Sequence, residues 1–100
     1  MITGVQMRAG RALLAIDQRE LARLAGLSLP TIQRMESSEG IVRAVVDSLE
    51  KVIQAFSDAG IELMGEGAPS IGQGRGVRLM ARRPARLASV SAEPNDERLE

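Results

Sequence analysis

The chain contains neither cysteine nor histidine, and Phe56 is its only aromatic residue. The first absence excludes a disulfide framework, a Cys/His zinc site and a histidine-based catalytic triad. The scarcity of aromatics means that the core must be built from aliphatic side chains. No apolar run approaches the ~20 residues of a membrane span, and no segment is typical of a signal peptide. We therefore expect one small cytoplasmic domain with no membrane partner.

An excess of charge of one sign is also missing, because the formal net charge is +0. The charges are nevertheless unevenly spread: residues 1–40 sum to +1, 41–65 to −2, 66–86 to +4 and 87–100 to −3. Affinity for nucleic acid would have to come from local groups, helix termini and dimerisation rather than from a general basic field. The segment 75–86 is either an arm along a DNA backbone or a solvated strand edge. Its arginines are Arg75, Arg78, Arg82, Arg83 and Arg86.

The most informative segment is residues 18–37, which read QRELARLAGLSLPTIQRMES. This pattern predicts two short helices joined by a glycine turn. Gly26 falls where the turn needs a positive φ, which glycine adopts freely. Ala22 lies where the two helices must touch, and Ile32 and Met35 face inward from the second. The layout is that of a helix-turn-helix, whose second helix enters the major groove of DNA.

A helix over residues 3–16 precedes this unit. Thr3 and Gln6 have the spacing of a capping box at its start. Gly10 lies inside the helix, where alanine would be the better helix former if that face is free. The helical spacing of the apolar residues predicts one buried face. Its members are Val5, Ala9, Ala12, Leu13 and Ile16.

The remaining helices also have start and stop signals. Asp17 is expected to cap the second helix and Ser28 the third, in whose first turn Pro30 is tolerated. A long fourth helix is expected over residues 43–59 and is stopped by Gly60. The apolar face of this fourth helix consists of Val45, Leu49, Val52, Ile53 and Phe56.

The pattern changes after the fourth helix. Residues 61–64 and 77–80 are short runs with β-like alternation, and the glycine-rich stretch between them predicts a flexible loop. An isolated hairpin is marginal in water, so it has to pack on the helices or pair with another chain. The composition beyond it predicts a mobile tail. The expected parts are a helix-turn-helix domain over 1–60, a β extension and candidate dimerisation element over 61–81, and the tail over 82–100.

The segment TGVQMRAGRALLAIDQRELARLAGLSLPTIQRMES resembles the Xre/Cro/C1 family of helix-turn-helix regulators, of the lambda-repressor-like type. The resemblance covers about residues 2–80. The positions that match together are Gln18, Leu21, Ala22, Gly26, Ser28, Ile32 and Glu36. It implies a mainly α fold with a bundle of four to five helices, to which the two expected strands add a short C-terminal β extension.

The resemblance also implies a DNA-binding site. Its expected members are Gln18, Ser28, Leu29, Pro30, Gln33, Arg34 and Ser37, most of them in the recognition helix 28–37. Gln18 opens the second helix, where the family hydrogen-bonds a phosphate. Arg34 is the strongest base-reading candidate, because a guanidinium can bond guanine O6 and N7 together, and Gln33 has the amide that suits adenine. Leu29 and Pro30 suit a thymine methyl group.

In this family an arginine of the first helix meets the glutamate that ends the recognition helix, in a mostly buried ion pair. Arg11 and Glu36 occupy the matching positions, so we interpret Arg11 as structural rather than as a DNA contact. Asp17 and Glu39 depart from the family pattern. Acids beside a phosphate-binding edge weaken non-specific affinity, which makes binding as a dimer more necessary.

The expected function is that of a transcriptional regulator which binds double-stranded DNA as a homodimer and either blocks or contacts RNA polymerase. We expect no enzyme, because the carboxylates do not cluster on one predicted face with a polar pocket. No cofactor and no metal are expected. One alternative is an antitoxin that binds a toxin through residues 61–100 and represses its own operon. A second is a helical interaction module with no role at DNA.

Overall fold

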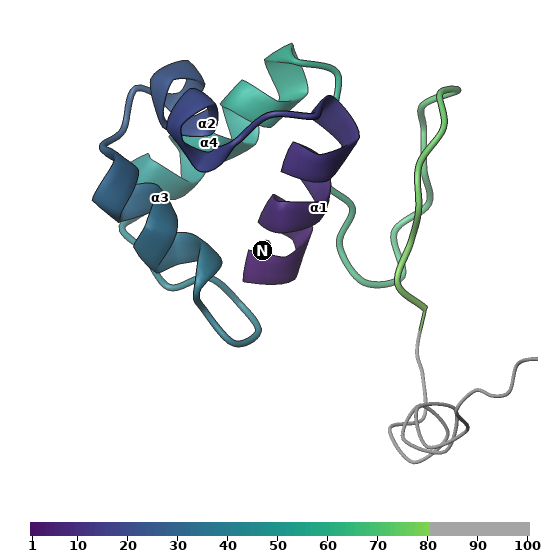
Figure 1. Ribbon diagram of the computed structural model, residues 1–100. Coiled ribbons are helices and arrows are strands. Elements are labelled where there is room, and N and C mark those ends of the chain that lie inside the picture. The colour runs from purple at the N-terminus through teal and green to yellow at the C-terminus, as the bar shows by residue number, and fades with distance from the viewer. Residues whose placement is uncertain (81–100) are drawn as a thin grey trace, which may run out of the picture.

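The structure, a computed structural model, describes residues 1–80. Figure 1 shows four helices, which are α1 (Gly4–Leu14), α2 (Gln18–Ala25), α3 (Leu29–Glu36) and α4 (Val46–Asp58). The expected mainly α fold is thus confirmed, with four helices in this part of the chain. Helix α2 packs on α3 and α4, and α1 packs on α3. No helix among these residues combines the length and apolar character needed to cross a membrane.

Three helices begin at the caps expected from the sequence. At the start of α1, the Thr3 Oγ1 accepts from the Gln6 N–H at 3.1 Å, and the Gln6 Oε1 accepts from the Thr3 N–H at 2.9 Å. The Asp17 carboxylate accepts a backbone N–H of α2, and the Ser28 hydroxyl accepts one from α3. Each cap satisfies a donor that the helix itself cannot pair. Helix starts were therefore predictable because capping depends on residues only three positions apart.

The core is aliphatic around one phenylalanine, as the composition requires. Phe56 has an exposed fraction of 0%, and burying a side chain of this size contributes about 1.5–3 kcal/mol. The other buried apolar residues are Ile2, Met7, Leu21, Ala22, Ala25, Ile32, Met35, Val42, Val52 and Ala55. The inward positions expected for α2 and α3 are all among them.

The expected buried face of α1 is only partly present, because Ala9 is partly buried and Ile16, just beyond the helix, packs against the core, whereas the other three residues do not. Val5 and Leu13 are about half exposed, at 50% and 52%, and Ala12 is exposed. The residues of α1 that face the core are instead Gly4, Met7 and Gly10. The expected residues and the observed ones both recur at helical spacing. A pattern that counts apolar side chains ignores glycine, so it selected the exposed face with Val5 and Leu13 instead of the face with Gly4 and Gly10.

The two glycines of α1 allow neighbouring groups to approach its backbone. A Cβ on Gly4 would lie 2.6 Å from the carbonyl oxygen of Glu36, at the end of α3. A Cβ on Gly10 would lie 2.7 Å from Cε1 of Phe56, on α4. Neither distance leaves room for a methyl group. The absence of side chains at these positions is therefore what lets α1 close over the bundle.

An extended pairing near the N-terminus was not expected from the sequence. Thr3 and Ile41 form an isolated antiparallel bridge, and the Val42 N–H donates to the carbonyl oxygen of Ile2 at 2.8 Å. Ile2 and Val42 are both buried, at 4% and 1% exposed. This pairing, which we call the N-terminal strap, ties the first residues of the chain to the loop that follows α3.

Helix α4 is shorter than expected, because it begins at Val46 rather than near residue 43. Val52 and Phe56 are buried and Leu49 is partly buried, as expected for the inner face. Val45 and Ile53 are exposed at 70% and 41%. The strap pairs residues 41 and 42 with the N-terminus, and Val45, with φ −65° and ψ 150°, is extended and serves as an N-cap without a side-chain acceptor.

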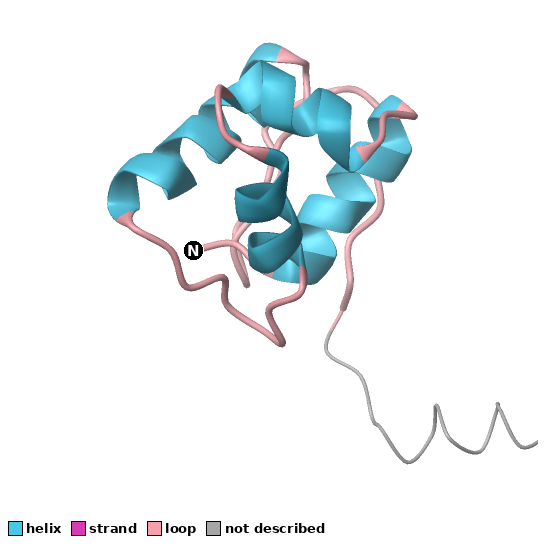
Figure 2. Ribbon diagram, turned by 60° about the vertical axis from the view of Figure 1, so that its left-hand side comes forward, coloured by secondary structure: helices cyan, strands magenta, loops and turns pink. Residues whose placement is uncertain are grey.

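The two expected strands, 61–64 and 77–80, are not formed in the structure. Within residues 1–80 no strand is present (Figure 2), because no backbone ladder joins the two runs. Side chains close the glycine-rich loop instead: the Glu62 carboxylate accepts from the Ser70 hydroxyl at 3.0 Å and from the Ile71 N–H at 3.1 Å. Residue 81 of the expected β extension and the expected tail over 82–100 lie outside the described residues.

Candidate nucleic-acid interface

Helices α2 and α3 meet at a turn whose geometry depends on Gly26. Its φ is +69°, in the left-handed region that side chains with a Cβ rarely adopt. No atom lies within 4 Å of the place where a Cβ would sit, so the requirement concerns backbone conformation rather than space. The turn brings Ala22 of α2, which is 5% exposed, against the buried side of α3. The opposite side of α3 is thereby presented outward.

The outward side of α3 carries a single exposed stripe, polar except for one proline, which we call the α3 stripe. It consists of Pro30, Gln33, Arg34 and Ser37, all of them exposed. Their spacing of three and four residues places them on one helical face. The residues of α3 that face the interior are Ile32, Met35 and Glu36. The helix thus separates a packing face from a face that is open to a partner.

Arg34 and Gln33 are the groups of the α3 stripe best able to bind a partner. The three ion pairs found among residues 1–80 are Arg11–Glu36, Arg23–Glu20 and Lys51–Asp47, so the Arg34 guanidinium is not neutralised by any of them. It offers several N–H donors in a planar fork, and the Gln33 amide offers both a donor and an acceptor. These are the groups that read guanine and adenine edges in a major groove.

The serine hydroxyl groups at the two ends of α3 are both engaged within the protein. The Ser28 hydroxyl lies 2.8 Å from the Thr31 hydroxyl and also caps the helix, so it is largely engaged within the protein. The Ser37 hydroxyl donates to the Arg34 carbonyl oxygen at 2.8 Å. Leu29 is partly buried and Pro30 is exposed, so the groove-entering end expected from the sequence presents mainly apolar surface.

Glu36 is the one buried charged residue among those described, with 2% of its surface exposed. Its Oε2 accepts from Nε of Arg11 at 2.6 Å, and its Oε1 accepts from Nη2 of Arg11 at 2.9 Å. The hydrogen bond to Glu36 raises the pKa of Arg11, against the opposing effect of burial. Arg8 also donates to the Glu36 carbonyl oxygen. The ion pair assigned to these two positions is therefore present, and it joins α1 to the end of α3.

Gln18 belongs to the same buried network, which sequence reasoning missed. Its amide Nε2 donates to Oε1 of Glu36 at 2.9 Å, and the side chain is partly buried. The bond spans 18 residues, so no local pattern indicates it. The phosphate-binding capacity expected of Gln18 would therefore rest mainly on the backbone N–H groups that open α2. Asp17 partly offsets that positive helix end, since its carboxylate caps α2.

The charges on α2 are largely balanced. Arg23 Nη2 lies 2.5 Å from Oε2 of Glu20, and both side chains are exposed. The hydrogen bond from Arg23 lowers the pKa of Glu20 and keeps it ionised. A paired arginine contributes less long-range attraction than a free one. Arg34 and Arg19 are both exposed and belong to none of the three ion pairs, so they are the cations left available beside this turn.

No family model, no curated protein and no solved structure matches this chain.

Proposed function

We propose that the chain is a sequence-specific DNA-binding transcriptional regulator that acts as a homodimer, in the manner implied by its resemblance to the Xre/Cro/C1 family. The observation that carries the proposal is the α3 stripe, held outward by a helix whose opposite face is locked by the Glu36 network. Recognition helices need this division, because base contacts require a rigid support as well as free polar groups.

In the proposed mechanism α3 enters the major groove, and the α3 stripe faces the base edges. Arg34 donates to O6 and N7 of guanine, and Gln33 pairs with adenine in the same half-site. Leu29 and Pro30 contact a thymine methyl group. The N–H groups that open α2, at Gln18, bind a phosphate and fix the register of the complex without reading sequence.

Two copies are needed because the protein has no general basic field. A dimer places two copies of α3 in successive major grooves, at half-sites separated by about 34 Å. Bound near a promoter, such a dimer represses by blocking RNA polymerase or activates by contacting it. The antitoxin alternative shares this DNA-binding step and differs in what residues 61–100 bind.

The test begins with selection from a library of random DNA duplexes by the full-length protein at fixed salt. We expect enrichment of a site with two related halves, and affinity that falls as salt rises. Arg34→Ala should lose about 1–3 kcal/mol at one base pair per half-site and relax the preference there. Lys51→Ala is the matched control, because it removes one positive charge from an exposed position of α4.

Two results would contradict the proposal. The first is a wild-type protein that enriches no sequence and shows no salt-dependent binding. The second is an Arg34→Ala variant whose affinity and sequence preference are both the same as those of the wild type. Equal losses on all sequences would instead reduce Arg34 to a backbone contact and leave the reading to Gln33, Leu29 and Pro30.

A further inference from the structure

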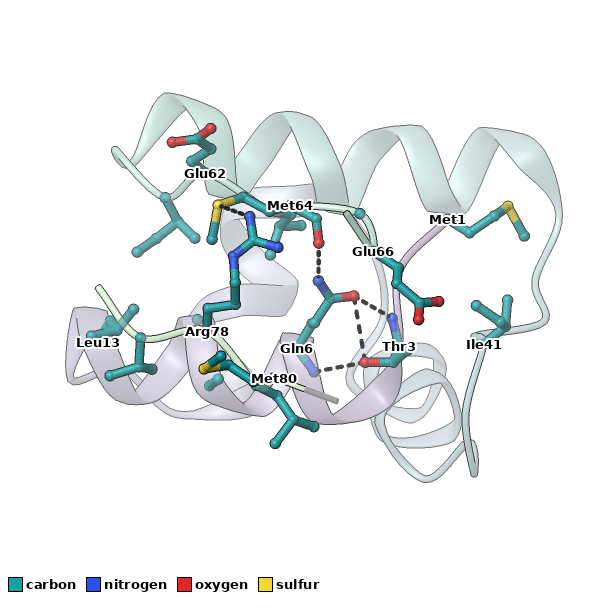
Figure 3. A pocket seen from close by; sticks show the side chains of 17 residues that line it. Met1, Thr3, Gln6, Leu13, Ile41, Glu62, Met64, Glu66, Arg78 and Met80 are labelled. Atoms are coloured by element: carbon teal, nitrogen blue, oxygen red, sulfur yellow. Dashed lines mark hydrogen bonds between the residues drawn. The ribbon is translucent and has the colours of Figure 1, made fainter. Parts of the chain in front are cut away.

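A groove of about 810 Å³ lies between α1 and the chain that follows α4 (Figure 3). One wall is the outer face of α1, with Gln6, Ala9 and Leu13. The other wall is formed by residues 61–66 and 77–80. Gly4, on the inner face of the same helix, contacts α3. In Figure 1 the chain that follows α4 and helix α3 lie on opposite sides of α1, so the groove and α3 are on different sides of this helix.

The walls of this groove are apolar and exposed. Leu13 has an exposed fraction of 52%, Val77 of 76%, Leu79 of 72% and Met80 of 73%. Met1 and Ile41 extend the same surface at its other end. Single exposed apolar residues are ordinary, but a contiguous group that lines a groove marks an interaction site.

The second wall is held in place by polar contacts with the bundle and within the loop. The Gln6 amide Nε2 donates to the carbonyl oxygen of Met64 at 2.7 Å. Arg78 donates to the Met64 sulfur at 3.0 Å and to the carbonyl oxygen of Ala68. Glu62 anchors the intervening loop through backbone N–H groups, including that of Ile71. The groove is thus formed before any partner arrives.

The rim of the second wall, residues 77–80, has a backbone that is unpaired within the described part of the chain. Among the described residues after Gly60, the backbone–backbone hydrogen bonds are those donated by Ile61 and Ala68. Residues 77–80 make none with the backbone of residues 1–80, and their side chains alternate in character. Such an edge is a template for another extended chain. Antiparallel pairing of residues 77–80 with the same residues of a second molecule satisfies these groups symmetrically.

The charges on the rim favour an identical partner. Glu62 and Glu66 lie within residues 61–66, and Arg78 lies within residues 77–80, which Arg75 shortly precedes. Because both signs are present, the surface does not suit DNA or an anionic membrane, which attract positive charge alone. These four charges sum to zero, so two copies of this surface can meet without the repulsion that a rim of one sign would cause.

We propose that this groove is the dimer interface, in which Leu79 and its neighbours of one copy pack against Leu13 of a second copy of the same chain. This interface deepens the proposed function. Only its role at DNA rests on that function, because dimerisation itself does not require DNA. A partner seated here leaves both α3 stripes free, so that each can enter a major groove.

The test measures the mass of the full-length protein by sedimentation equilibrium without DNA, across about a hundredfold range of concentration. The wild type should approach twice 10.7 kDa. Leu79→Asp and Leu13→Asp place charges in the buried interface and should raise the dimer dissociation constant more than about tenfold. Val46→Asp is the matched control, because Val46 is 68% exposed, lies at the start of α4 and is outside the groove lining.

The interface would be supported if the wild type and Val46→Asp are dimeric and the two leucine variants dissociate, with unchanged helical circular dichroism. A wild type that stays monomeric throughout would overturn it and leave the groove to a different protein, such as a toxin. Equal dissociation of all three variants, or of none, would also overturn it. Because no DNA is present, these outcomes are independent of whether the duplex selection succeeds.

Discussion

Replacing Glu36 by alanine should destabilise the fold even though the residue lies in the recognition helix. The carboxylate is 2% exposed and accepts two hydrogen bonds from Arg11 and one from Gln18. Breaking a buried ion pair by removing one partner costs about 3–5 kcal/mol, because the other charge stays behind uncompensated. Arg11 is 19% exposed and keeps a hydrogen bond to the Ile16 carbonyl oxygen, so part of its charge can be hydrated.

The expected loss for Glu36→Ala is therefore near the lower limit, at about 3 kcal/mol. In a domain of this size that loss lowers the melting temperature by roughly 12–24 °C. Thermal unfolding followed by circular dichroism, without DNA, measures it. The difference should persist in high salt, because a buried pair is poorly screened.

Glu20→Ala is the control, since Glu20 also pairs with an arginine on a helix but both side chains are exposed. It should change the melting temperature little. Equal melting temperatures for Glu36→Ala and Glu20→Ala would refute the reasoning. A double variant, Arg11→Met with Glu36→Leu, should be more stable than Glu36→Ala because it leaves no unpaired charge.

Three further predictions concern other parts of the fold. Gly10→Ala should lower the free energy of unfolding by about 1–3 kcal/mol in chemical denaturation, because the added methyl group would meet the buried Phe56 ring. A variant with a higher free energy of unfolding would show that the ring can move aside. Ala15→Gly should raise the free energy of unfolding by about 0.5 kcal/mol in the same assay, because Ala15 has a φ of +58°, which glycine adopts more readily. An unchanged or lower denaturation midpoint would contradict backbone strain at Ala15. Hydrogen bonds from Ile71 and its neighbours lower the pKa of Glu62. The hydrogen bond between the Ile71 amide and the Glu62 carboxylate should therefore persist below the ordinary titration range of glutamate and be lost as pH falls further. An NMR shift of the Ile71 amide that titrates with an ordinary glutamate midpoint would contradict this prediction.

The parts of the fold that were predictable from sequence depend on local interactions. The caps at Thr3, Asp17 and Ser28 join residues three positions apart, and the turn at Gly26 depends on one dihedral angle. Each of these signals is complete within a few residues. Helix positions and the inner faces of α2 and α3 follow from them.

The errors arose where the outcome depends on distant residues. The inner face of α1 is formed by glycines, and only the position of Phe56, on α4, shows why Gly10 must lack a side chain. The bond from Gln18 to Glu36 and the N-terminal strap also join separate parts of the chain. The alternation in residues 77–80 indicates an extended chain, but a strand also needs a partner, which residues 1–80 do not supply.

The N-terminal strap has a consequence for how the chain folds. Helices α2, α3 and α4 are neighbours in sequence and can associate early, because closing short loops costs little entropy. The strap joins Ile2 to Val42 and can form only after the loop behind α3 has taken its shape. We therefore expect α1 to dock last and to open first. In native-state hydrogen exchange, the Val42 amide should exchange through a partial opening that leaves the amides of α2 and α4 protected.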